Sequence, residues 1–185
     1  AHEKVLHYLD IPIQHVDSDI LARMNRPCPE GHMQRIFRYI RSLDDLFTLR
    51  TTIMTGFPGE SAESFERVID FGSEIEFDRL GAFIYSPEEG TKAAKFSGKV
   101  NRKTAEARCN RLMELQTEIS QERSELFIDH ELDVLIEDID TEANEAWGRS
   151  YRDAPEVDGL VCVSGINAKK LKCGEIVKAK VFDCA

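Results

Sequence analysis

Apolar and polar residues follow two different periods along the chain, and the period changes near residue 124. Before that point, short apolar runs precede stretches in which apolar residues recur every three or four positions, the pattern of a strand followed by an amphipathic helix. These units predict strands over 5–13, 47–55 and 79–85, and helices over 29–43, 61–74 and 102–125. Strands that alternate with helices form a parallel sheet, so the pattern predicts an α/β fold.

After residue 126 the pattern becomes a simple alternation of apolar and polar residues. Segments 132–139, 146–154, 159–165 and 175–182 alternate in this way and are separated by Gly, Asp and Asn. Several short strands in about 60 residues are typical of a small antiparallel barrel of the OB-like kind. We therefore predict two domains, over 1–123 and 124–185.

The first domain leaves two interpretations open. Three strand–helix units fall short of the eight that close a (β/α) barrel. The domain is therefore either a small doubly wound sheet or the later part of such a barrel. Two details are expected in either case: Pro29 and Glu30 open the first helix, and Ser61 caps the second.

The net charge of −10 is distributed unevenly. Residues 1–123 hold 17 basic and 20 acidic residues, whereas residues 124–185 hold 7 basic and 14 acidic residues and have a net charge of −7. An acidic chain is a poor coat for nucleic acid, and its acidic second domain favours a basic partner. No run of about 18 apolar residues is present, so we expect no membrane span. The chain has no initiator Met and no signal peptide, so we expect a fragment of a longer protein.

The five cysteines predict buried thiols and no metal site. They are widely spaced and form no C-x-x-C pair, which argues against a zinc site or a redox dithiol. Unpaired thiols fit a reducing, cytoplasmic location. The positions are Cys28, Cys109, Cys162, Cys173 and Cys184.

Polar residues and glycines follow each predicted strand of the first domain. Parallel sheets bind ligands at the carboxyl ends of their strands. The corner Gly56-Phe57-Pro58-Gly59-Glu60 exposes main chain to a flat group, and its carboxylate would repel phosphate. It therefore favours a planar neutral or cationic ligand such as a nucleoside, although it could equally serve only as a turn from strand to helix. Gln14 and His15 end the first strand, where they contact a ligand or hold a loop.

Arg50 and Tyr85 are further candidates, and no catalytic residue stands out. An Arg within an apolar strand needs an anion, which is either a ligand carboxylate or an internal Asp or Glu. Tyr85 is more typical of a core position than of a ligand contact. We find no nucleophile–base pair and no internal metal-binding motif, so no catalytic and no metal-binding residue is assigned.

Four collinear segments together resemble a known family: LDIPIQHVDSDILARMNRP, LRTTIMTGFPGES, FDRLGAFIYSPEEGTKAA and GRSYRDAPEVDG. They resemble the radical-SAM methylthiotransferases, most closely those of the RimO type. The resemblance implies a methylthiotransferase domain, a radical-SAM (β/α) barrel and a C-terminal TRAM domain, an OB-like barrel. This chain matches only the later part of the barrel, with three βα units, and the TRAM domain. The C-x3-C-x2-C motif of the barrel's 4Fe-4S cluster would lie upstream of Ala1.

The resemblance also implies a reaction and its cofactors. S-adenosyl-L-methionine is cleaved at one 4Fe-4S cluster to a radical that abstracts hydrogen from carbon, and a methylthio group reaches that carbon through a second cluster. The implied target is an aspartate of small-subunit ribosomal protein number twelve. Because the cluster ligands would lie outside it, this chain alone is expected to be inactive. The positions that match cofactor-binding segments are Gln14, Arg50, Thr52, Gly56, Phe57, Pro58, Gly59, Glu60 and Tyr85.

Two alternatives to this function remain. A tRNA methylthiotransferase is related, but an excess of Lys and Arg would be expected in residues 124–185. A non-catalytic acidic module that binds ribosomal proteins belongs to a different class, and the chain alone could perform that role. The acidic second domain favours a basic ribosomal protein over nucleic acid as the partner.

Overall fold

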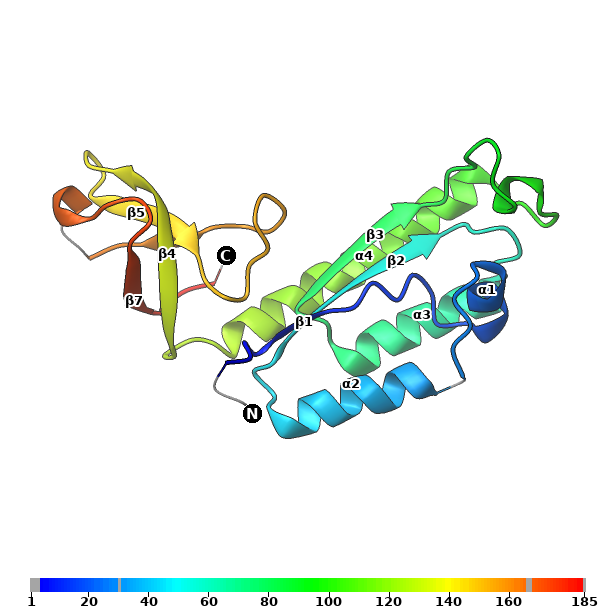
Figure 1. Ribbon diagram of the computed structural model, residues 1–185, viewed down its shortest axis with the longest axis horizontal. Coiled ribbons are helices and arrows are strands. Elements are labelled where there is room, and N and C mark those ends of the chain that lie inside the picture. Colours follow the sequence, from blue (N-terminus) through cyan, green and yellow to red (C-terminus); the bar gives the residue numbers. More distant parts are fainter. Residues whose placement is uncertain (1–3, 30, 166–167, 185) are drawn as a thin grey trace. The chain divides into compact units, whose positions relative to one another are not determined.

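The computed structural model describes residues 4–29, 31–165 and 168–184 (Figure 1). Leu9–Ser124 forms one compact unit, which we call the α/β unit. The chain from Glu125 onward, together with residues 4–8, belongs to a second, the β unit. None of the helices in the described part of the chain combines the length and apolarity that a membrane crossing requires.

The α/β unit is built on a three-stranded sheet in the order β1-β2-β3. Strands β2 and β3 are parallel, and Gln14 bridges Ile53 of β2 in the same direction, which confirms the predicted parallel sheet. The elements are β1 (Tyr8–Asp10), α1 (Ser18–Arg23), α2 (His32–Leu43), β2 (Thr48–Thr55), α3 (Ala62–Ile75), β3 (Arg79–Ile84), a 3-10 turn (Ala93–Lys95) and α4 (Arg102–Glu125).

Local side-chain chemistry explains where these elements begin and end. Ser61 caps α3 as predicted, because its hydroxyl accepts the Ser64 N–H at 3.0 Å while the Ser64 hydroxyl accepts the Ser61 N–H at 2.8 Å. Helix α2 begins at His32, after Gly31 at φ 68°, rather than at residue 29. The expectation that Glu30 lies in its first turn falls outside the described residues. Strand β1 is shorter than predicted at both ends, and on the carboxyl side Pro12 interrupts the pairing because it has no N–H to donate.

Three helices cover one face of the sheet. Leu49 and Ile53 of β2 and Leu80 of β3 point to this face, where they pack against α2, α3 and α4. The helices contribute Phe37, Val68, Phe71, Ile75 and Leu112 to the same core. The opposite face is more open: Phe83 is 40% exposed, and a Cβ built on Gly81 would meet no atom within 4 Å.

The β unit is an antiparallel sheet in the order β6-β5-β4-β7, as the alternating pattern predicts. Gly148 lies so close to β4 that an added Cβ would be 2.1 Å from the Leu135 carbonyl oxygen. The strand predicted over 146–154 ends at Arg149, because Ser150 and Asp153 form a turn in which the hydroxyl donates to the carboxylate at 2.7 Å. The strands are β4 (Glu131–Asp140), β5 (Glu145–Arg149), β6 (Val161–Val163) and β7 (Ile176–Lys180), with a 3-10 turn at Ala168–Lys170.

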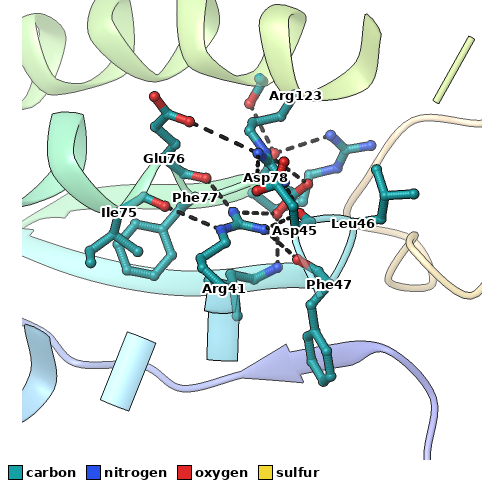
Figure 2. A network of polar contacts seen from close by, with 12 residues as sticks. Arg41, Asp45, Leu46, Phe47, Ile75, Glu76, Phe77, Asp78 and Arg123 are labelled. Atoms are coloured by element: carbon teal, nitrogen blue, oxygen red, sulfur yellow. Dashed lines mark hydrogen bonds and ion pairs between the residues drawn. The ribbon is translucent and has the colours of Figure 1, made fainter. Parts of the chain in front are cut away.

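A buried carboxylate joins the elements at the amino ends of β2 and β3 (Figure 2). Asp78 is fully buried, and its Oδ2 accepts the Leu49 N–H at 2.9 Å and an Arg41 N–H at 2.9 Å. Arg123 of α4 places Nε 3.7 Å from Asp78 Oδ1 and donates to Asp45 Oδ1 at 3.1 Å. One carboxylate therefore connects α2, β2 and α4.

We predict that Asp78→Ala lowers the free energy of unfolding by about 3 to 5 kcal/mol, because it leaves two largely buried guanidinium groups without their shared partner. Glu74→Ala is the matched control, since it removes the partner of the mostly exposed Arg38 and should cost less than about 1 kcal/mol. Urea denaturation of the whole chain measures both values. Equal losses in the two variants would contradict the assignment of Asp78 as the anchor.

Candidate functional site

The segments that follow the three strands of the α/β unit meet at one edge of the sheet. The Tyr85 N–H donates to the Thr55 carbonyl oxygen at 2.8 Å, which joins the end of β3 to the end of β2. The Gln14 N–H donates to Thr52 at 2.8 Å, and the Met54 N–H donates to Gln14 at 2.8 Å. The sequence-predicted corners therefore lie side by side.

The two glycines of the Gly56–Glu60 corner have a packing role. Gly56 has φ 76° and Gly59 has φ 96°, in the region that favours glycine. An added Cβ on Gly56 would lie 2.5 Å from the Ala105 Cβ of α4, and one on Gly59 would lie 2.2 Å from an Arg23 nitrogen. Because neither glycine carries a side chain, α4 and Arg23 can pack directly against this corner.

The Glu60 carboxylate is used inside the protein. Its side chain is fully buried, its two oxygens accept the Gly56 N–H at 3.1 and 3.0 Å, and Arg108 of α4 donates to Oε1 at 2.5 Å. His15 is also fully buried, with Nε2 3.5 Å from Glu60 Oε2. Contact of Glu60 with a cofactor stays a prediction, but the observed partners give the carboxylate a different use.

Arg50 and Thr52 lie on the more open face of β2, and the Gln14 backbone pairs with β2 at Ile53. Gln14 has φ 70°, which is uncommon outside glycine, and its side chain is half-buried. Arg50 is largely buried, with Nε 3.7 Å from Asp10 Oδ2, so the structure provides the internal carboxylate that the sequence left as one of two options. Thr52 lies between Arg50 and Met54 on the same face of β2.

Aromatic rings and a pocket complete the site. Phe57 packs edge-on against Tyr85 at 5.2 Å and against Phe96 at 6.2 Å, measured between ring centroids. The Tyr85 hydroxyl is buried and makes no hydrogen bond with the described residues. A pocket of about 350 Å³ lies beside it, a size that suits a small ligand. Its lining residues are Pro58, Ile84, Tyr85, Ser86, Pro87, Lys99, Val100, Arg102 and Ala105.

The expectation of buried thiols is wrong. Cys162 and Cys173 are exposed, and Cys28, Cys109 and Cys184 are half-buried. Cys162 occupies the outward-facing middle position of β6, so the alternation that identified the strand also turns this side chain to solvent. Desolvation of the thiolate, followed by the charge of Glu145, raises the pKa of the Cys162 thiol, which favours its protonated form. No three His, Cys, Asp or Glu side chains within the described ranges are grouped to hold a metal ion.

Comparison with known proteins gives one family match and several relatives that are similar over nearly the whole chain. The family model of the TRAM domain matches residues 128–185. The whole chain is similar to proteins named ribosomal protein uS12 methylthiotransferase RimO. The protein of Fervidobacterium nodosum is 45% identical over 184 residues, which is 99% of this chain and 42% of that protein. The proteins of Petrotoga mobilis and Klebsiella pneumoniae are each 42% identical, over 97% and 98% of this chain and 40% of theirs.

The chain corresponds to the C-terminal region of a RimO-type methylthiotransferase. It spans about two fifths of the length of the curated relatives that it matches. The TRAM match falls in the β unit, where the alternating pattern predicts an OB-like barrel, and the structure shows a four-stranded antiparallel sheet.

Sequence reasoning missed the contribution of α4 to the site of this RimO-type chain. Arg108 lies 48 residues beyond Glu60, and Ala105 lies 49 residues beyond Gly56. Both positions read as ordinary helix residues, and no local pattern links them to the corner. Arg108 follows Ala105 by three residues, which places both on the same side of α4. This spacing is the one sequence signal that could have linked the two residues.

We predict that Gly56→Ala destabilises the chain by at least about 1 to 2 kcal/mol, the cost of a left-handed residue, with the overlap against Ala105 adding to it. Gly81→Ala is the matched control, because its added Cβ meets open space. Thermal and urea unfolding of the two variants give the comparison. If both glycines tolerated alanine equally well, the close packing of α4 on the corner would be refuted.

Proposed function

We propose that the chain is the C-terminal part of an enzyme that adds a methylthio group to an aspartate of ribosomal protein uS12 by radical S-adenosylmethionine chemistry. The observation that carries this proposal is 40 to 45% identity, over nearly the whole chain, to proteins that bear the name of that activity. The chain alone, covering about two fifths of those proteins, is proposed to be inactive.

The architecture of the α/β unit supports its assignment as part of a (β/α) barrel. The sheet order β1-β2-β3 follows the chain order, and the helices lie on one face. A doubly wound sheet would place helices on both faces and reverse its strand order. The more open face, which carries Arg50, Thr52 and Gly81, would then be the inner wall of the barrel.

The strand-end edge suits the adenosyl part of S-adenosylmethionine. The pocket beside Pro58 and Tyr85 has mostly apolar walls, and the buried Tyr85 hydroxyl offers a polar group that the protein leaves unused among the described residues. Gln14, Arg50 and Thr52 would face the remainder of the cofactor from the open side. When bound with a 4Fe-4S cluster, the cofactor supplies the radical chemistry, while these residues hold and orient it and exclude water.

The described residues do not fit a 4Fe-4S cluster. They offer no group of three ligands, and the exposed Cys162 and Cys173 lie in the β unit, separated by ten residues of sequence. We therefore assign both clusters to parts of the enzyme outside this chain.

The charge of the β unit supports a basic protein as its partner. Asp133 and Glu137 pair with Lys178 and Arg149. In contrast, the β4–β5 hairpin carries exposed acidic side chains that form no ion pair with any described residue, namely Asp138, Asp140 and Glu142. These three residues, the hairpin acids, attract a cationic segment and repel a phosphate backbone.

We predict that a chimera with the N-terminal part of the Fervidobacterium nodosum protein and this chain as its C-terminal part methylthiolates an aspartate of uS12. Mass spectrometry of uS12 and of tRNA, each incubated with the reconstituted chimera, measures the product. The N-terminal part alone is the control and should be inactive. Modification of tRNA instead of uS12 would replace the proposed substrate. Sequencing the gene that encodes this chain gives a second test. If no C-x3-C-x2-C motif is encoded upstream of the codon for Ala1, the radical-SAM assignment is overturned.

We also predict that replacing the hairpin acids with Lys weakens binding of uS12 to the chimera by tenfold or more, because long-range attraction becomes repulsion. The combined exchange Asp133→Lys and Lys178→Asp is the control, since it conserves both the net charge and the ion pair. Titration at several salt concentrations should show a smaller salt dependence for the hairpin variant. Unchanged affinity in that variant would place the partner elsewhere.

A further inference from the structure

We propose that His15, Glu60 and Arg108 form a buried positioning group that orients the Gly56 corner and Gln14 for the cofactor without contacting it. The inference deepens the proposed function and rests on it for the identity of the cofactor. It assigns to Glu60 a role in positioning the corner, and it adds Arg108 and His15, which lie behind the corner, to the residues on which the site depends.

The Glu60 carboxylate is buried. An ionised carboxylate shielded from water requires close donors and a counter-charge. The Gly56 N–H and the Arg108 guanidinium supply them at 3.0 and 2.5 Å. Arg108 is itself largely buried, lies over the Phe65 ring at 5.5 Å and also donates to the Glu60 carbonyl oxygen at 3.2 Å. Neither charged group can turn away without leaving the other unmatched.

The Glu60 carboxylate holds the peptide unit between Thr55 and Gly56. Its N–H donates to Glu60, and its carbonyl oxygen accepts the Tyr85 N–H at 2.8 Å. The same peptide is therefore held from both sides, by the buried carboxylate and by the end of β3. The Thr55 hydroxyl adds a bond of 3.2 Å to the Ala105 carbonyl oxygen on α4. The direction of the corner thus follows from the position of Glu60.

His15 connects the buried positioning group to Gln14. The Asp17 N–H donates to His15 Nδ1 at 3.0 Å, so the ring nitrogen that faces Glu60, at 3.5 Å, is the protonated one in the neutral ring. His15 Nε2 makes no hydrogen bond in the described part of the chain, so its contact with Glu60 is this close approach alone. With His15 buried beside Glu60, the preceding residue Gln14 is held at φ 70° and kept at the edge of β2. Strained residues of this kind persist where surrounding contacts hold them.

The experiment separates positioning from general stability by removing one charge and then both. Glu60→Gln leaves the buried Arg108 unmatched and replaces one acceptor oxygen with an amide group. The double variant Glu60→Gln with Arg108→Met removes both charges, so its unfolding midpoint in urea should return most of the way to that of the parent. Arg111→Met is the matched control, because Arg111 contacts the same Phe65 ring from an exposed ion pair with Glu66.

Two readouts report on positioning. In the 185-residue chain, the hydrogen-exchange rate of the Gly56 amide, measured by NMR, should rise about tenfold in both the single and the double variant, because the charged acceptor is gone. In the chimera, the Kd for S-adenosylmethionine should likewise rise about tenfold in both variants and stay unchanged in Arg111→Met. Recovery of stability without recovery of affinity is the expected signature.

Other outcomes contradict the inference in distinguishable ways. If Gly56 exchange in Glu60→Gln stays as slow as in the parent, the carboxylate does not orient the corner. If affinity returns together with stability in the double variant, the group is structural only. If the parent chimera itself shows no affinity for S-adenosylmethionine, the proposed function fails, whereas the exchange result still decides whether Glu60 orients Gly56.

Discussion

Helix α4 is held against the sheet near both of its ends by a largely buried arginine that meets a buried carboxylate. Arg108 meets Glu60 at the carboxyl ends of the strands, and Arg123 meets Asp78 at their amino ends. The two arginines are fifteen residues apart, about 22 Å along a helix, which is close to the length of the eight-residue strand β2. The carboxylates lie beyond opposite ends of the strands, Glu60 after β2 and Asp78 just before β3, so the two pairs together prevent the helix from sliding or tilting.

The candidate site depends on this arrangement because α4 forms its rear wall. Ala105 fills the space where a side chain on residue 56 would lie, and it accepts a hydrogen bond from Thr55. A shift of α4 by less than the width of a methyl group would disturb the corner, since the packing there leaves no gap. The buried pair at Asp78, remote from the site, therefore contributes to site geometry through the rigid helix.

The periodic pattern was sufficient for most of the secondary structure because amphipathic faces are local properties. It located α4 at Arg102–Glu125 and the Ser61 cap of α3. It missed α1, which has only six residues and begins after an Asp17 cap, in a stretch to which no element was assigned. It also assigned too much strand near residue 150, where Ser150 and Asp153 form a turn. These are short elements, in which one side-chain hydrogen bond outweighs periodicity.

The site was less predictable because its important contacts join distant residues. The segments that follow the strands were expected to lie side by side, and they do, because parallel topology alone brings them together. The direction of the Glu60 side chain could not be predicted from the sequence, because it depends on Arg108, which lies 48 residues further along the chain. The two units also differ in how they use acidic residues. In the α/β unit, Glu60 and Asp78 are buried and matched, so salt in the solvent screens them little, whereas the hairpin acids of the β unit are exposed and unmatched. The proposed cofactor site and the proposed partner surface should therefore respond differently to ionic strength, because the first depends on buried charges and the second on exposed ones.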